Sequence, residues 1–399
     1  MRALVLALLP ALALAAPPPA DRRVSSFLVP MDPTAEGMGV RMETYMNEAL
    51  DHFQGFAVRK PEELFGLPPD TAAQAALDRA RKGYSASVAA YDKKEYDEAE
   101  KKVRNVLKEL EGAAGAMQGC SPLCDALALY AALLQLRGDV EEAKLALIDL
   151  MAVAPTHELD PKRFSRELIT LRVQVATGRT AQLRGSATVK SRPAGARVFM
   201  DGELVGYTPV TLPALSIGKH LVRLERPGFR LHGLLLEVTP DDVESNTTLV
   251  PTAAYKAYDA MHDKVSGEVI QGGGQSNGVA ALGQTLGLDR AMVGTLKTVE
   301  NGTELHLGYY ETRNGKRMGG RRVVLQGDEF GQLKQEMERM VNQLVNTSGE
   351  KVRLSKDPLD NKGGTEDWSS EDRGGRAKAQ EKKKKADDPL DGVSGTEDW

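Results

Sequence analysis

The sequence predicts a multidomain α+β fold, because the spacing of its apolar residues changes from one part of the chain to the next. Residues 71–178 carry Ala, Leu, Lys and Glu at helical spacing, which indicates an array of helices. Residues 185–250 alternate short apolar stretches with turn residues, which is typical of a small β-sandwich. Residues 24–66 and 253–346 mix the two patterns, so we expect a mixed α/β module formed from both ends of the chain.

The composition is that of an ordinary globular protein with two or three domains. Hydrophobic residues make up 41% and charged residues 27% of the 399 residues, so the chain can bury sizeable cores. The formal net charge of −4 argues against a dedicated nucleic-acid surface, and we expect no nucleic-acid partner.

The amino terminus has the pattern of a secretory signal peptide over residues 1–16. A charged start, Met1-Arg2, is followed by a short apolar run that ends in small residues near Ala16. The run is too short to span a bilayer, and no later segment is apolar enough to do so. We therefore expect an exported protein of the periplasm or cell envelope of a Gram-negative bacterium. A disordered or buried amino terminus is the alternative.

Residues 24–66 predict a β-α-β unit. Strands are expected at residues 24–29 and 56–58, with a helix over residues 38–53 between them. Proline is favoured at the first helical position, so Pro61 is expected to begin a short further helix. This order resembles the start of the TolB amino-terminal domain and of the curli-secretion lipoprotein.

Residues 71–178 predict helical hairpins. Two helices are expected over residues 71–112, and a further helix over residues 161–176 would begin at Asp160 as its N-cap. Small residues at Ala131 and Ala143 would let two helices of a hairpin pack closely.

The spacing of these small residues, with Gly138-Asp139 between them and Pro155 after them, resembles the tetratricopeptide repeat. The resemblance implies a concave groove that binds a segment of a partner protein. Ordinary packing of helical hairpins is the alternative.

Cys120 and Cys124 flank Ser121-Pro122-Leu123, and we expect a disulfide in an oxidising compartment. It would staple the entry to a helix that Ser121 caps and Pro122 begins. A redox role is the alternative, although oxidoreductase motifs usually place two residues between their cysteines.

Residues 185–250 predict short strands separated by turns. Asp201-Gly202 suits a hairpin because both residues tolerate positive φ. Gly206 and Thr208-Pro209 are expected to break the next strand. The strands are expected at residues 187–189, 196–200, 209–212, 220–224, 231–238 and 247–250.

This stretch resembles a PEGA domain, although the motif reads Pro193-Ala194-Gly195-Ala196, with alanine in place of glutamate. The resemblance implies a bacterial envelope protein that interacts with proteins or glycans. The motif residues are expected to shape the fold and not to catalyse; they are Pro193, Gly195, Asp201, Gly202, Gly206, Pro209, Gly218 and Gly228.

Residues 253–346 predict an α-β-β-β-α order. Helices are expected at residues 253–265, 279–286 and 330–345, and strands at residues 290–299, 303–312 and 321–325. The order resembles the second half of the TolB-like and curli-like modules. Neither end of the chain buries a good core alone, so we expect residues 24–66 to pair with residues 280–345.

Residues 348–399 are charged and rich in glycine, and we expect a disordered tail. The tail repeats one pattern, in which Pro-Leu-Asp is followed by Gly-Thr-Glu-Asp-Trp. A functionless duplication is one interpretation, and a pair of docking motifs is the other. The anchors of such motifs would be Pro358, Leu359, Trp368, Pro389, Leu390 and Trp399.

No pattern in the sequence indicates an enzyme. The six histidines lack zinc-ligand spacing, and the glycine-rich loop at residues 271–275 lacks the Gly-Lys-Ser/Thr ending of a phosphate loop. We expect no cofactor and no metal.

The sequence thus favours a non-enzymatic scaffold that binds envelope proteins, and in addition peptidoglycan, through the repeat-like groove, the PEGA-like sandwich and the tail. A structural part of an envelope motility or secretion machine is one alternative. A cell-wall enzyme that acts through the mixed module is the other.

Overall fold

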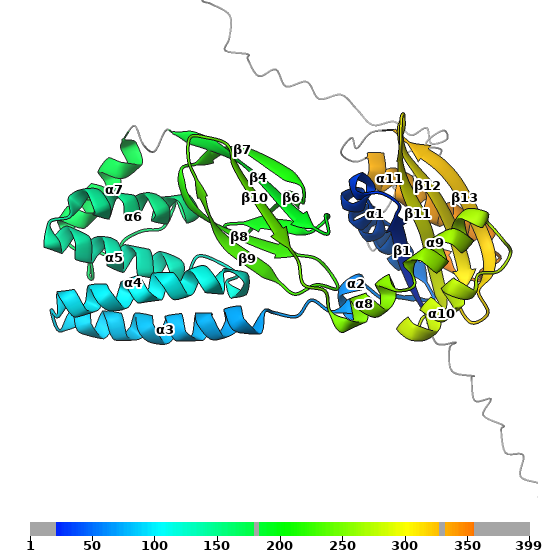
Figure 1. Cartoon of the computed structure of the whole chain (residues 1–399), viewed down its shortest axis with the longest axis horizontal. Coiled ribbons are helices and arrows are strands. Elements are labelled where there is room, and N and C mark those ends of the chain that lie inside the picture. Colours follow the sequence, from blue (N-terminus) through cyan, green and yellow to red (C-terminus); the bar gives the residue numbers. More distant parts are fainter. Residues whose placement is uncertain (1–20, 179–182, 327–331, 355–399) are drawn as a thin grey trace, which may run out of the picture. The chain divides into compact units, whose positions relative to one another are not determined.

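The structure is a computed structural model that describes residues 21–178, 183–326 and 332–354 (Figure 1). The expected signal peptide at residues 1–16 lies outside the described residues, and so do all six tail anchors. None of the described helices is long and apolar enough to cross a membrane. The multidomain α+β fold is confirmed: a helical region, a β-sandwich and a mixed module follow from the three sequence patterns.

A five-stranded sheet forms the centre of the mixed module. Its strand order is β13-β12-β11-β1-β3, so β1 lies between a strand from each end of the chain. β1 runs parallel to both neighbours, and Phe27 is opposite Val293 of β11. The strands are β1 (Arg22–Pro30), β3 (Phe56–Val58), β11 (Arg290–Val299), β12 (Gly302–Glu311) and β13 (Lys316–Leu325).

Helices cover both faces of this sheet (Figure 1). α1 (Pro33–Asp51) and α11 (Gln332–Thr347) pack together on one face, where Met42, Met46 and Met337 are fully buried. α9 (His262–Gln271) and α10 (Asn277–Leu286) cover the other face. Burial on both faces leaves six consecutive residues of β1 buried, from Val24 to Val29. Ser25 and Ser26 interrupt the apolar run, and their hydroxyls donate to the carbonyls of Arg59 and Glu43.

The helix expected over residues 253–265 is two helices, which corrects the prediction. α8 (Ala253–Asp259) ends at Ala260, and α9 begins after Met261. Both helices still pack into one cluster: the ring of Tyr258 in α8 lies 4.9 Å from that of Phe65 and 5.6 Å from that of Phe27 in β1, and Val265 and Val269 of α9 are buried in the same cluster. Phe65 belongs to α2 (Pro61–Phe65).

The tail was expected from Ser348, and this boundary is wrong. Residues 348–354 belong to the mixed module, because β14 (Arg353–Leu354) pairs antiparallel with β2 (Phe53–Gln54). The side chain of Glu350 is 2% exposed and forms ion pairs with Arg22 and Arg290. The segment is therefore held by the ion pairs of a buried carboxylate and by Val352, which packs against the core of the module.

The helical region consists of two hairpins and a last helix. The small residues Ala131 and Ala143 are fully buried where α5 meets α6. α5 is buried nearly all round, so it is the central helix of the region. The helices are α3 (Thr71–Asp92), α4 (Tyr96–Ala113), η1 (Ala114–Ala116), α5 (Leu123–Arg137), α6 (Val140–Val153) and α7 (Arg166–Thr177).

Two helix starts in this region differ from the prediction. α7 begins after Ser165, whose hydroxyl accepts the Leu168 N–H at 3.2 Å, while Asp160 accepts the Lys162 N–H in a preceding turn. α5 begins at Leu123, because the Ser121 hydroxyl donates to the Asp125 carboxylate and does not cap the helix. In each case the side chain expected to cap the helix forms a different local hydrogen bond, and the helix begins at a later residue.

The β-sandwich packs a three-stranded sheet of order β10-β4-β7 on a four-stranded sheet of order β6-β5-β8-β9. Val189, Val198 and Leu224 are fully buried between the sheets. The strands are β4 (Arg184–Arg192), β5 (Arg197–Met200), β6 (Glu203–Tyr207), β7 (Val210–Ser216), β8 (Gly218–Glu225), β9 (His232–Val238) and β10 (Val243–Thr248).

β6 was missed from the sequence, where Gly206 was expected to break the strand. Gly206 instead lies inside β6 with φ +151°, opposite Val198 at a shift of the strand register. A glycine inside a strand often marks such an irregularity, and the strand continues through it.

Candidate functional site

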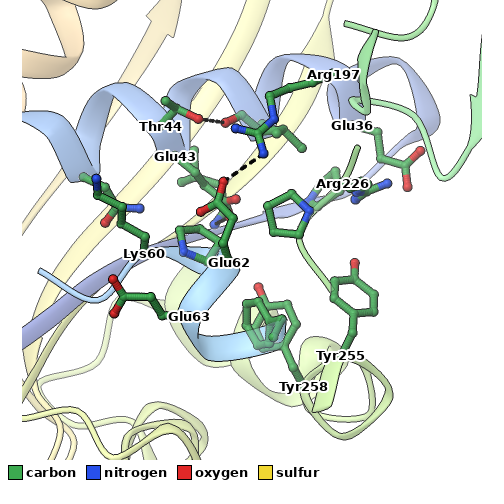
Figure 2. A pocket seen from close by; sticks show the side chains of 18 of the residues that line it. Glu36, Glu43, Thr44, Lys60, Glu62, Glu63, Arg197, Arg226, Tyr255 and Tyr258 are labelled. Carbon is green, nitrogen blue, oxygen red and sulfur yellow. Dashed lines mark hydrogen bonds and ion pairs between the residues drawn. The ribbon is translucent and has the colours of Figure 1, made fainter. Parts of the chain in front are cut away.

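A cavity of about 720 Å³ opens where the mixed module meets the sandwich (Figure 2). α1, α2, α8 and α9 of the module line it, and the sandwich contributes Arg197, Tyr207 and Arg226. We call it the acidic cavity, because seven carboxylates line it: Glu36, Glu43, Glu48, Asp51, Glu62, Glu63 and Asp259.

One face of α1 supplies the wall of the acidic cavity. Glu36, Glu43 and Asn47 recur at helical spacing, so they project from the same side of the helix. α1 is fixed at its start by Asp32, one carboxylate oxygen of which accepts the N–H groups of Thr34 and Ala35. The other oxygen accepts the Thr298 N–H at 2.7 Å, which ties α1 to β11.

Hydrogen bonds hold the sandwich against the module around the cavity. The Gly228 N–H donates to the Gly66 carbonyl at 2.7 Å, and the Ala194 N–H donates to the Glu36 carboxylate at 2.9 Å. Arg197 also forms an ion pair with Glu62 at 3.2 Å, which Figure 2 shows as a dashed line. The walls of the cavity are therefore set by contacts that the protein itself makes.

Glu43 lies at the base of the cavity, with its carboxyl enclosed by protein although part of the side chain still faces the cavity. One carboxyl oxygen accepts the Leu28 N–H at 2.6 Å. Burial raises the pKa of Glu43 to about 7, although this hydrogen bond and the charge of Arg226 oppose the rise. The carboxyl therefore changes charge near neutral pH.

Asn47 lies one helical turn from Glu43, and its side chain is incompletely paired. Its amide oxygen accepts the Ser26 N–H at 3.0 Å, but its amide nitrogen Nδ2 has no hydrogen-bond partner. Asn47 is only 6% exposed, so this nitrogen is also withheld from bulk water. An unsatisfied buried donor costs about 1–3 kcal/mol, which a suitable acceptor would recover.

Aromatic side chains form the opposite wall. The rings of Tyr255 and Tyr258 lie below the carboxylates, with their hydroxyls directed toward the cavity (Figure 2). Burial raises the pKa of Tyr255 to about 12 and also raises that of Tyr258, so both stay neutral. Burial lowers the pKa of His262, whose ring packs edge-on at 4.4 Å from Tyr258.

A second hollow, of about 460 Å³, lies on the helical region where α4, α5 and α6 meet the sandwich. Lys219 at the start of β8 closes one end of it. We call it the leucine groove, because its apolar lining consists mainly of leucines: Leu107, Leu123, Leu127, Tyr130, Leu145, Ala146 and Leu235.

The two cysteines lie in neither hollow. Cys120 and Cys124 are joined in a disulfide at the entry to α5, with their Cα atoms 5.4 Å apart. Cys124 is almost completely buried. This position fits a structural staple for the connection between η1 and α5.

The PEGA-like motif residues form turns and close contacts. At Gly228, with φ +86°, a Cβ atom would meet the Tyr255 ring at 2.4 Å, so this glycine lets the sandwich approach α8. Asp201 adopts φ +53° in the turn between β5 and β6. The other glycines of the set also have positive φ: Gly195, Gly202, Gly206 and Gly218. Pro193 and Pro209 flank the β4–β5 and β6–β7 connections.

The sequence did not single out the residues of the acidic cavity. The helical spacing of Glu36, Glu43 and Asn47 could have indicated that these polar residues share one face of α1. The position of Glu43 directly after the inward-facing Met42 could have indicated that Glu43 is partly buried. Arg226 and Tyr258 come from other elements, and no local pattern connects them with α1. Among the described residues, no group of three or more His, Cys, Asp or Glu side chains is arranged to hold a metal ion.

Comparison with known proteins identifies one part of the chain. The family model of the PEGA domain matches residues 184–252, which make up the sandwich and the residues just after it. No curated protein and no solved structure matches the chain significantly. The tetratricopeptide-like and TolB-like resemblances have no support from a family match. The sandwich is thus similar to a PEGA domain, which points to an exported protein with an interaction role in the cell envelope.

Proposed function

We propose that this protein is a non-enzymatic scaffold of the Gram-negative periplasm, and that a segment of a partner protein docks in the leucine groove. The observation that carries the proposal is the groove itself, a largely apolar hollow between α4, α5, α6 and the sandwich that no described segment covers. Scattered exposed leucines are normal, but leucines gathered in one hollow are typical of an interaction site.

The lining of the groove suits a short amphipathic segment. Leu145 is 63% exposed and stands at the edge of the groove. Burying a leucine side chain contributes about 1.5–3 kcal/mol, so two or three such anchors would support a stable complex. Charged side chains at the rim would orient the segment: Arg104, Glu111, Glu142, Asp149 and Lys219.

The groove also has rigid walls. The Lys219 N–H donates to the Asp149 carboxylate at 3.0 Å, and the Arg223 guanidinium donates to the Met117 carbonyl at 3.2 Å. These bonds fix the sandwich on α6 and on the residue after η1. A partner would therefore bind without first ordering the site, which lowers the entropic cost of association.

The test is site-specific photocrosslinking in the full chain. A photoreactive amino acid at Leu145 should yield a discrete crosslinked partner, while the same group at Val324, 45% exposed on β13, should not. Leu145→Asp should then abolish co-purification of that partner, and Val324→Asp should leave it unchanged. Equal crosslinking at both positions, or none at Leu145, would contradict the proposal.

A further inference from the structure

We propose that the acidic cavity binds a basic peptide segment, with a lysine or arginine side chain reaching the carboxyl of Glu43. This site is separate from the leucine groove and does not depend on the function proposed for it. Four observations carry the inference: the charge of the lining, the position of Glu43, the unpaired Asn47 and the aromatic wall.

The lining of the cavity has an excess of negative charge. Three of its seven carboxylates form ion pairs: Glu62 with Arg197, Glu63 with Arg59 and Glu48 with Lys334. A fourth, Asp259, lies 3.3 Å from the ring of His262, whose lowered pKa keeps it neutral near pH 7. The remaining three are Glu36, Glu43 and Asp51, and the lining offers them only Arg226 and Lys60. A cation that enters the cavity would reduce this imbalance.

Glu43 is the deepest of the unpaired carboxylates. Arg226 influences it electrostatically, but its guanidinium donates to the Ala194 carbonyl at 2.6 Å and lies over the ring of Phe229. Among the described residues, no lysine or arginine forms an ion pair with Glu43. A ligand cation could take that place in a site that water reaches poorly, where charge attraction is stronger than at the surface.

Asn47 indicates that the ligand also carries an acceptor. Its unpaired Nδ2 has almost no accessible surface, so an oxygen of a ligand would reach it only if the Asn47 side chain turned toward the cavity; a bare metal ion or a simple amine could not supply that oxygen. A peptide carries both groups, because a basic side chain offers donors to Glu43 and a backbone carbonyl accepts from an amide. The combination therefore favours a peptide over a free amine.

The remaining wall suits an aliphatic stem that ends in a cation. The rings of Phe65, Tyr255 and Tyr258 form one side of the cavity, and aromatic faces attract ammonium and guanidinium groups. A volume of about 720 Å³ lies within the usual range of ligand sites and holds more than one side chain.

Protonation of Glu43 gives the site a testable pH dependence. Several titratable or charged groups line the cavity around Glu43. They are Arg226 from the sandwich, His262 from α9, Tyr255 and Tyr258 from α8, Glu36 from α1, and Lys60 and Glu62 at α2. The tyrosines stay neutral near pH 7, and His262 gains a proton only at lower pH. With the pKa of Glu43 at about 7, affinity should rise roughly tenfold from pH 6 to pH 8.

The experiment measures binding of a fluorescein-labelled trilysine peptide to the full-length protein by anisotropy. The peptide should bind at pH 8, while the same peptide with Nε-acetylated lysines should not. Glu43→Gln keeps an acceptor for the Leu28 N–H but removes the charge, so it should weaken binding roughly tenfold at pH 8 and flatten the pH profile. Glu167→Gln on α7 makes the same change in net charge and should bind normally.

Three results would overturn the inference: equal binding of the acetylated peptide, an unchanged Glu43→Gln variant, or cadaverine that competes as well as the lysine peptide. Asp51→Asn, at an exposed rim position, should weaken binding two- to threefold and covers the case in which Glu43→Gln folds poorly. Leu145→Asp should bind the peptide normally, so failure of this site and failure of the leucine groove can be told apart.

Discussion

The sandwich and the mixed module each bury an apolar core, but the sandwich uses residues that are close in the sequence and the module uses residues that are far apart. The sandwich is built from one stretch, residues 184–252, and its strands are joined by tight turns. The module combines residues 22–66 with residues 253–354. Its closure depends on contacts between residues more than 260 positions apart, such as Arg23 with Asp289.

The difference between the two regions shows which structural features can be inferred from neighbouring residues in the sequence. In the sandwich, a turn such as Asp201-Gly202 indicates its own conformation, because the residue types fit positive φ. In the module, Asp32 caps its own helix and binds Thr298 with the same carboxylate. The first role can be inferred from neighbouring residues, whereas the second requires knowledge of the fold.

The largest expected effect follows from removing the amino-terminal part of the module. Deletion of residues 21–66 removes β1 and β3 from one edge of the sheet, together with α1, the helix that packs on α11. We expect the sheet residues of β11 and β12 to lose their protection, because the three remaining strands lose β1 from their edge and lose α1, with the buried Met42 and Met46, from one face. Hydrogen exchange should show full loss of protection there, while β5 and β8 of the sandwich keep theirs.

The control for this experiment is deletion of residues 355–399, which lie beyond the last described strand. This deletion should leave the protection of β11 and β12 unchanged. If β11 and β12 stay protected without residues 21–66, the two ends of the chain do not depend on each other, and the contrast with the sandwich disappears.

A smaller effect is expected at the buried ion pairs of Glu350. Glu350→Gln keeps the shape of the side chain but leaves Arg290, which is itself largely buried, with only Glu311 at 3.5 Å. Removing one partner of a buried ion pair costs about 3–5 kcal/mol, so the free energy of unfolding should fall by about 3 kcal/mol. Urea unfolding followed by circular dichroism measures this loss.

Lys351→Gln supplies a matched control, because Lys351 is the exposed neighbour of Glu350. Its free energy of unfolding should stay within about 0.5 kcal/mol of the unmodified chain. A similarly small change in Glu350→Gln would mean that the ion pairs of Glu350 do not stabilise the module, and that residues 348–354 are held by the pairing of β14 with β2 instead.

Most of the secondary structure could be predicted from the sequence, because it depends on periodicity and local turn chemistry. The hairpins of the module, the break between α3 and α4 and the end of α10 at Gly287 all follow from such signals. The missed features depend on tertiary contacts. α8 and α9 separate because Tyr258 packs on Phe65, and Glu350 is buried because Arg22 and Arg290 reach it.

The acidic cavity could not be predicted for the same reason. Taken alone, Glu36, Glu62 and Asp259 are ordinary charged residues of helices. They acquire a common role only when the sandwich attaches to the module through Gly228 and Gly66. The PEGA-like motif predicted the glycine but not the surface that the glycine approaches.

The smallest expected effect concerns a charge pair inside the sandwich. His220 is 3% exposed, and its ring Nδ1 lies 2.6 Å from the Asp201 carboxylate, while Nε2 lies 2.9 Å from the Ser216 carbonyl. Burial alone would lower the pKa of His220, but the hydrogen bond and charge of Asp201 outweigh it and raise the pKa. Both ring nitrogens face acceptors, which favours the doubly protonated ring.

The substitution Asp201→Asn removes the negative charge at this position but should preserve the turn. Asparagine also tolerates positive φ and can accept the Leu221 N–H, which Asp201 accepts at 2.8 Å, so the hairpin should survive. Because the folded pKa of His220 is raised, its contribution to stability is complete below the usual histidine pKa and is lost as the pH rises through the folded value. The variant should therefore lose about 1–2 kcal/mol at pH 5.5 and less at pH 8.5.

Urea unfolding at the two pH values measures this difference, with Glu203→Gln in the same hairpin as an exposed control that should be flat with pH. A loss of equal size at both pH values would mean that Asp201 acts through the turn alone. A loss confined to low pH would show that even the contiguous sandwich, whose turns are evident from the sequence, is stabilised in part by a charge pair between the β5–β6 turn and β8. Both regions would then be stabilised by side-chain pairs that join separate segments, and they would differ only in how far apart those segments lie in the sequence.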